Sequence, residues 1–138
     1  MSLDKATLDA LASFPQTLEH FYSAVPTDYR HWTPPSWDGI PGETFTAIEQ
    51  ICHIRDIELD GYRKGFHRAL NETNPALDSL DSYVIAKQRH YSTANAAEVL
   101  ATFRTARADT IQLLSTLTPE QLARPAVFEG YAPSLSAD

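Results

Sequence analysis

Hydrophobic residues recur at three- and four-residue steps over most of the chain, which is the spacing of one face of an α-helix. We expect the longest helix over Gly42 to Leu70. Its apolar face comprises Phe45, Ile48, Cys52, Leu59, Tyr62 and Phe66. A second long helix is predicted after Asn95, where Glu98 completes a capping pattern. The seam of that helix comprises Leu100, Phe103, Arg107, Thr110, Leu114 and Leu117.

The first 25 residues have an interrupted helical pattern. Ser2 is placed to cap a short helix over Leu3 to Ala12. Ser13 then offers a second cap, with Pro15 in the first turn that follows. The sequence therefore predicts two consecutive helices here, the second of which is long and ends at Pro26.

A loop is predicted over residues 26–42, because prolines and glycines are concentrated there. It carries Trp32 and Trp37, which we expect to pack down onto the helices. Residues 71–78 are predicted to form a turn, residues 80–91 a short helix and residues 118–123 another. After Pro125 no helical period remains, and an irregular tail is expected. The predicted fold class is all-α, with one domain over residues 1–131 and a tail over 132–138.

Composition narrows the classes of function. The chain has 138 residues and a net charge of -7, with its lysines and arginines scattered. Nucleic-acid binding needs a basic face, so neither nucleic acid nor an anionic membrane is an expected partner. No apolar run approaches the roughly 20 residues of a membrane span. With one cysteine, no disulfide within the chain and no signal-peptide pattern, we expect a cytoplasmic protein.

The candidate for metal chemistry is His53, in the middle of the longest predicted helix. Glu49 and Asp56 lie four residues before it and three after it, on the same side of a helix. Histidine with carboxylates can bind a divalent metal, with Glu49 and Asp56 as accessory ligands. On spacing alone, however, a solvated or hydrogen-bonded histidine is the more common case. His20, His31, His67 and His90 are isolated and are expected at the surface.

Two other features of this helix have more than one interpretation. Cys52 lies on the apolar face, which favours a buried, inert thiol over a nucleophile. Gly61 and Gly65 lie four residues apart. They either permit the close approach of another helix or are tolerated weak points in the helix.

An ordered set of residues resembles the DinB/YfiT-like family. The set begins with Trp37 and continues with the stretch from Ile48 to Glu58, which contains His53-Ile54-x-Asp56-x-Glu58. Further along, in the family's order, come Tyr62-Arg63, Asn74-Pro75, Asp81, Tyr91, Phe103-x-x-x-Arg107 and Leu117-Thr118-Pro119-Glu120-Gln121-Leu122. The resemblance covers roughly residues 14–131.

This resemblance implies a four-helix bundle, often dimeric, that binds zinc, nickel or iron through three histidines. His53 matches the ligand on the second helix, and the other two ligands form an H-x-x-x-H pair on the fourth. Family members include thiol-dependent transferases and isomerases. This sequence departs from the pattern, because no histidine follows His90 and no fourth helix is predicted. We therefore expect three long helices with an incomplete metal site.

Two functions remain open from the sequence. One is a divalent-metal-dependent transferase or hydrolase acting on a small-molecule or thiol substrate, with His53 as the remaining part of the site. The other is a non-catalytic helical module for binding or oligomerisation. A missing helix would expose an apolar groove, which predicts a homodimer or a higher oligomer. The sequence indicates neither a catalytic residue nor a specific substrate.

Overall fold

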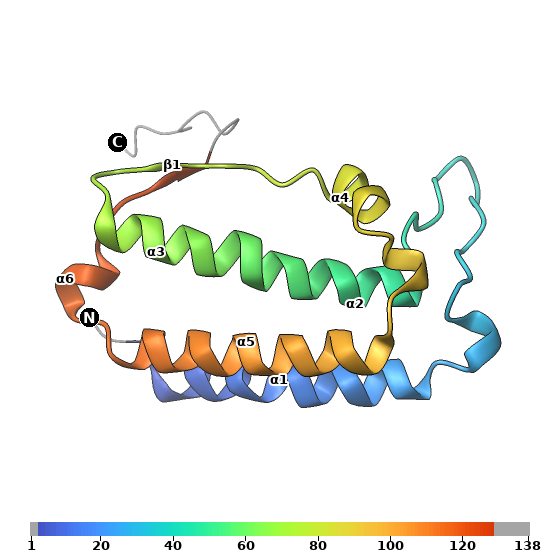
Figure 1. Ribbon diagram of the computed structural model, residues 1–138, viewed down its shortest axis with the longest axis horizontal. Coiled ribbons are helices and arrows are strands. Elements are labelled where there is room, and N and C mark those ends of the chain that lie inside the picture. The colour runs from blue at the N-terminus through green and yellow to red at the C-terminus, as the bar shows by residue number, and fades with distance from the viewer. Residues whose placement is uncertain (1–2, 129–138) are drawn as a thin grey trace.

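Three long helical rods form the body of the protein in the computed structural model, which describes residues 3–128. The first rod is α1 (Lys5–Ala24), and the third is α5 (Ala96–Ser115). The second rod consists of α2 (Ala47–Asp56), a π-helical segment η2 (Ile57–Arg63) and α3 (Lys64–Asn71). The rods run alongside one another, with α5 packed against both α1 and the second rod (Figure 1). The expected all-α fold is confirmed.

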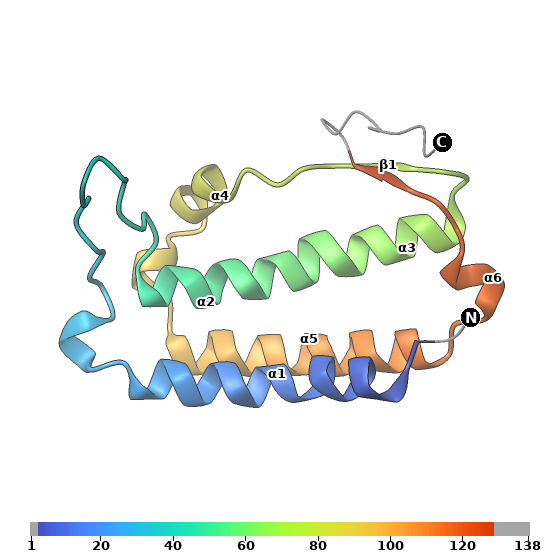
Figure 2. The ribbon, with the colours of Figure 1, turned by 180° about the vertical axis from the view of Figure 1, so that it is seen from behind.

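Short elements connect these rods and cover one side of them. They are η1 (Thr27–Tyr29), α4 (Ser82–Gln88), η3 (Tyr91–Thr93) and α6 (Pro119–Leu122). Two strands that the sequence pattern did not indicate, β1 (Ala76–Leu77) and β2 (Val127–Phe128), pair in parallel. They lie along the second rod on the side away from α5 (Figure 2). We call residues 76–81 the strap. The expected tail over residues 132–138 lies outside the described residues.

The two helices expected in the first 25 residues are a single helix, so that prediction was wrong. Asp4 caps it by accepting a hydrogen bond from the Thr7 backbone N–H, and Ser2, the expected cap, lies outside the described residues. Pro15 is buried inside the helix rather than at the start of a second one. Proline has no N–H, so the Leu11 carbonyl loses its usual donor four residues on. Arg107 of α5 replaces that donor, its Nη1 lying 2.9 Å from Leu11 O.

The second rod begins at Ala47, five residues later than the sequence pattern indicated. Thr46 and Glu49 form a capping box, in which Thr46 Oγ1 accepts from the Glu49 N–H and Glu49 Oε1 accepts from the Thr46 N–H. This pair satisfies two backbone donors that a helix start leaves open. The π-helical turn η2 was not predicted. Such turns usually occur as single insertions inside α-helices and are frequent at functional sites.

The loop over residues 26–42 is present, but its tryptophans do not pack down as expected. Trp32 is 50% exposed and Trp37 is 82% exposed. The loop is closed by its own backbone instead, through an antiparallel bridge between Trp37 and Ile40. A β-carbon at Gly42 would lie 2.0 Å from the Pro34 carbonyl oxygen. Only glycine therefore fits at position 42, where the chain comes back against Pro34. Backbone contacts therefore shape this loop.

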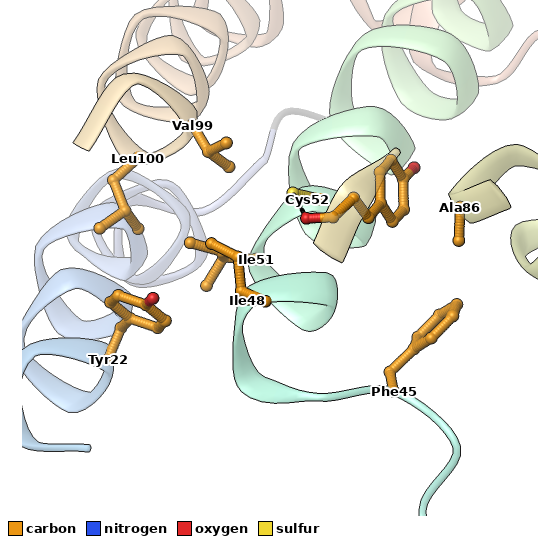
Figure 3. Close-up of a cluster of buried hydrophobic side chains, with 9 residues drawn as sticks. Tyr22, Phe45, Ile48, Ile51, Cys52, Ala86, Val99 and Leu100 are labelled. Atoms are coloured by element: carbon orange, nitrogen blue, oxygen red, sulfur yellow. Dashed lines mark hydrogen bonds between the residues drawn. The ribbon is translucent and has the colours of Figure 1, made fainter. Parts of the chain in front are cut away.

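The hydrophobic core lies between α1, α2, α5 and the segment from α4 to η3. Tyr22 and Ile48 meet Leu100 and Val99 across the centre of this core (Figure 3). Cys52 and Tyr91 are fully enclosed, at 0% and 1% exposure. The core therefore fills the half of the bundle around α2, and charged side chains become buried where the rod continues into η2.

Candidate functional site

His53 lies on α2, and its side chain is half-buried. Its ring packs against Phe45, with 5.5 Å between ring centroids. No group of three or more histidine, cysteine, aspartate or glutamate residues within residues 3–128 could hold a metal ion. His53, Glu49 and Asp56 therefore do not converge into a metal site. The described residues do not by themselves fit the metal that the resemblance implies.

Glu49 has a structural role in this fold. Its Oε1 accepts hydrogen bonds from the backbone N–H and the hydroxyl of Thr46, at 3.1 and 3.0 Å. The same carboxylate thus stabilises the start of α2. A capping signal, threonine followed three residues later by glutamate, was present in the sequence and explains this role better than metal ligation does.

Asp56 is buried and is the centre of what we call the Asp56 cluster, together with Arg55, Arg89 and Tyr91. Arg55 Nε donates to one carboxylate oxygen at 2.8 Å. The Tyr91 hydroxyl donates to the other oxygen, from which Arg89 Nη1 lies 2.9 Å away. Arg89 also pairs with Asp60 at 2.7 Å. This cluster joins the end of α2 to the segment that leads into η3.

Electrostatics within the Asp56 cluster favour an ionised carboxylate. Burial raises the pKa of Asp56, but the hydrogen bonds from Arg55 and Tyr91, and the charges of Arg55 and Arg89, outweigh it. The net result is a pKa below the ordinary value. Burial and the hydrogen bond to Asp56 raise the pKa of Tyr91. The tyrosine therefore stays protonated and donates to a carboxylate that stays charged.

Cys52 is the buried thiol that the apolar pattern predicted. It is 0% exposed, and burial raises its pKa to about 11. Its Sγ lies 3.9 Å from the Tyr91 carbonyl oxygen. A nucleophilic or metal-binding cysteine needs a thiolate, and this environment opposes one. The predicted burial of this thiol is confirmed.

A second buried carboxylate, Glu58, belongs to the motif that carries the family resemblance, but no role was predicted for it from the sequence. It is 1% exposed and makes a two-pronged ion pair with Arg107, at 3.0 and 2.9 Å. Arg107 also donates to Leu11 O and lies 5.1 Å from the Phe103 ring centroid. We call Glu58, Arg107 and the Leu11 carbonyl the Glu58 cluster. An arginine inside the apolar seam of α5 was the signal that a buried acid faced it.

The other histidines lie at the surface, as predicted. His20, His31, His67 and His90 are all exposed. His90 has a left-handed backbone, with φ 53, at the turn between α4 and η3. None of the four joins His53 in a group that could hold a metal among residues 3–128.

A cavity of about 680 Å³ lies beside the second rod. Its walls are η2 and α3, the strap, the end of α5 and α6. Ile57 lines the end of the cavity next to α2, and it lies one helical turn beyond His53 in the sequence. Gly61 and Gly65 line it as well, and β-carbons there would lie 3.8 and 3.5 Å from leucines of the strap. The strap thus lies close to the rod at both glycines, although a β-carbon would fit at either position.

Comparison with known proteins identifies the family. The family model described as DinB superfamily matches residues 10–137. The chain belongs to the DinB superfamily. Among solved structures, it is similar to YfiT from Bacillus subtilis, described as a probable metal-dependent hydrolase with an unusual four-helix bundle topology. The two share 26% identity with a TM-score of 0.74, over 93% of this chain and 71% of YfiT. No curated protein matches.

The family assignment confirms the resemblance drawn from the ordered motifs. Residues 3–128 supply three long helices, whereas YfiT is described as a four-helix bundle. In this described range, no helix is long and apolar enough to cross a membrane.

Proposed function

We propose that this DinB protein takes part in divalent-metal-dependent chemistry of the hydrolase or transferase type, with His53 as one metal ligand. Support comes from the family and from YfiT, a probable metal-dependent hydrolase. The observation that carries the proposal is the half-buried position of His53, one turn from a cavity large enough for a small-molecule or thiol substrate. Zinc, nickel and iron are the candidate metals.

The remaining ligands must come from outside the set of residues that the structure places around His53. Glu49 already accepts hydrogen bonds from Thr46, and Asp56 is engaged by two arginines and a tyrosine. A catalytic metal site has about three protein ligands and one open position. We therefore propose that a second copy of the chain completes the site.

Metal stoichiometry tests this proposal directly. The 138-residue chain would be incubated with zinc or nickel, freed of excess metal and analysed for bound ions, beside His53→Ala and the exposed control His67→Ala. We expect retained metal in the parent and in His67→Ala but not in His53→Ala. Equal retention by all three proteins, or none by any, would contradict a role for His53.

The alternative is a non-catalytic helical module for binding or oligomerisation. Two observations favour it: the large cavity beside the second rod and the absence of a metal-holding group among residues 3–128. Phe21, at 66% exposure, adds apolar surface on α1. We propose a homodimer in a cytoplasmic setting as the simplest assembly. A chain that retains no metal but forms a stable dimer in light scattering would support this alternative over the first proposal.

A further inference from the structure

The cavity beside the second rod has an apolar body. Large aliphatic and aromatic side chains line it along the whole length of the rod between residues 57 and 69, about 18 Å at the rise of a helix. Examples from all its walls are Ile57, Phe66, Leu77, Ile85, Leu117 and Leu122. Its volume lies within the range of about 300–1,000 Å³ that is typical of small-molecule sites. An elongated apolar molecule fits this shape.

The charge around the cavity has the opposite sign to that of the chain. Four cationic side chains line it, Lys64, Arg68, Arg89 and Arg124, against two acidic ones, Asp60 and Asp78. The whole chain carries a net charge of -7. The cavity is thus a locally positive region of an acidic protein, and an anion is the ligand whose charge matches it.

Arg124 is the cationic group best placed to meet such an anion. Lys64 and Arg89 already pair with Asp60, and Arg68 pairs with Glu72. Arg124 makes no ion pair among residues 3–128 and donates only to backbone carbonyls, from Nε to Ala69 and from Nη2 to Glu72. These two hydrogen bonds of 2.7 and 2.8 Å hold the guanidinium at the α3 end of the cavity. Its charge therefore has no carboxylate partner within residues 3–128.

We propose that this cavity binds an amphipathic carboxylate, with its anionic group at Arg124 and its apolar body along the rod toward Ile57. The guanidinium offers N–H donors that suit a carboxylate, and charge-assisted hydrogen bonds of this kind are about twice as strong as neutral ones. The cavity is the one that the proposed function uses for its substrate, but the binding proposed here needs neither His53 nor a metal, so it can fail or hold independently of the metal site.

Calorimetric titration of the metal-free chain in a chelating buffer tests the proposal. The probes are dodecanoate and dodecyltrimethylammonium, which have the same alkyl length and opposite head charges. We expect dodecanoate to bind with one molecule per chain, about ten-fold more tightly than the cation, as one charge-assisted hydrogen bond predicts. Equal affinity for both probes would overturn the assignment of an anionic head group.

Variants locate the binding site. Arg124→Gln should remove most of the preference for dodecanoate, whereas Arg104→Gln, an exposed arginine paired with Glu19, should bind as the parent does. Leu117→Trp should abolish binding by filling the cavity, whereas Val84→Trp, at an exposed position, should not. Unchanged binding by Leu117→Trp would place the ligand elsewhere and overturn the proposal.

Two further measurements keep the result unambiguous. Circular dichroism establishes whether each variant is folded. If Leu117→Trp does not fold, Gly61→Leu takes its place as the variant that fills the cavity. If neither variant folds, equal affinity of the parent for dodecanoate and for the cation overturns the proposal, and a preference for dodecanoate supports it. Light scattering on the same samples tests whether a second copy fills the cavity instead. A dimer that Leu117→Trp dissociates, in a protein that does not bind dodecanoate, would also overturn the proposal.

Discussion

Two buried carboxylates, two residues apart on the same rod, have different partners. Asp56 faces the segment around η3, where three separate side chains surround it. Glu58 faces the other rods, where Arg107 alone binds both its oxygens and also reaches Leu11 of α1. The Asp56 cluster therefore fastens a connecting segment to the rod, whereas the Glu58 cluster links all three rods through one guanidinium. Loss of a single partner should therefore lower the free energy of unfolding more at Glu58 than at Asp56.

The largest effect is expected from Arg107→Met. It would leave the Glu58 carboxyl group, 1% exposed, without its ion pair, and would leave the Leu11 carbonyl without its donor. Breaking a buried pair on one side costs about 3–5 kcal/mol. Urea denaturation should show this loss in the free energy of unfolding. The double variant Glu58→Leu/Arg107→Met should recover most of it, and a double variant as unstable as the single one would refute the argument.

Tyr91→Phe should have a smaller effect. It removes one hydrogen bond to Asp56 but leaves both arginines in place. A hydrogen bond to a charged group contributes about 1.5–3 kcal/mol. The same denaturation experiment should therefore rank Tyr91→Phe below Arg107→Met. The reverse order would show that the Asp56 cluster is the more important link.

Pro15→Ala tests the connection between α1 and Arg107. Alanine restores an N–H that can donate to Leu11 O, the acceptor that Arg107 now uses. The substitution should stabilise the Arg107→Met variant more than it stabilises the parent, by about 1 kcal/mol in a double-mutant cycle. Strictly additive effects would mean that the proline and the arginine are independent.

Acid should weaken the Asp56 cluster through protonation of its carboxylate. The folded-state pKa of Asp56 lies below its ordinary value of 3.8. Its contribution to stability is therefore complete above that value and is lost as the pH falls through the folded-state pKa. Tyr91→Phe narrows the pKa difference between the folded and unfolded states. The loss of stability between neutral and acid pH should be smaller in this variant, and an unchanged pH dependence would argue against the cluster.

The smallest effect is expected from Arg104→Gln. Arg104 pairs with Glu19 on the surface of α1 and α5, where the two side chains are 58% and 46% exposed. Exposed pairs of this kind contribute little, so the free energy of unfolding should change by less than about 0.5 kcal/mol. A larger change would mean that surface pairs, rather than the Glu58 cluster, hold α1 against α5.

Local signals in the sequence were enough to predict several elements correctly. The Asn95 and Thr118 caps start α5 and α6 where the pattern placed them. Cys52 is buried as its apolar neighbours implied. The ordered motifs indicated the family that the comparison then identified. Each of these features depends on residues within a few positions of one another, or on motifs in a recognisable order.

Other features were predicted wrongly, because distant residues decide them. Pro15 reads as a helix start, but Arg107, 92 positions later, replaces the missing donor and lets α1 continue. Trp32 and Trp37 read as buried anchors, yet the loop closes through its own backbone at Gly42. The pairing of β1 with β2 is too short to leave a periodic signal.

The sequence by itself determined the helical class, the caps and the family, because hydrophobic period and capping chemistry act over one or two helical turns. It also marked His53 as the residue to test. Only the tertiary structure decided which buried acid meets which arginine, that Glu49 caps a helix, and that a positively lined cavity lies beside the rod. Those outcomes depend on side chains that burial brings together, and a charge removed from water must find its partner wherever the fold supplies one.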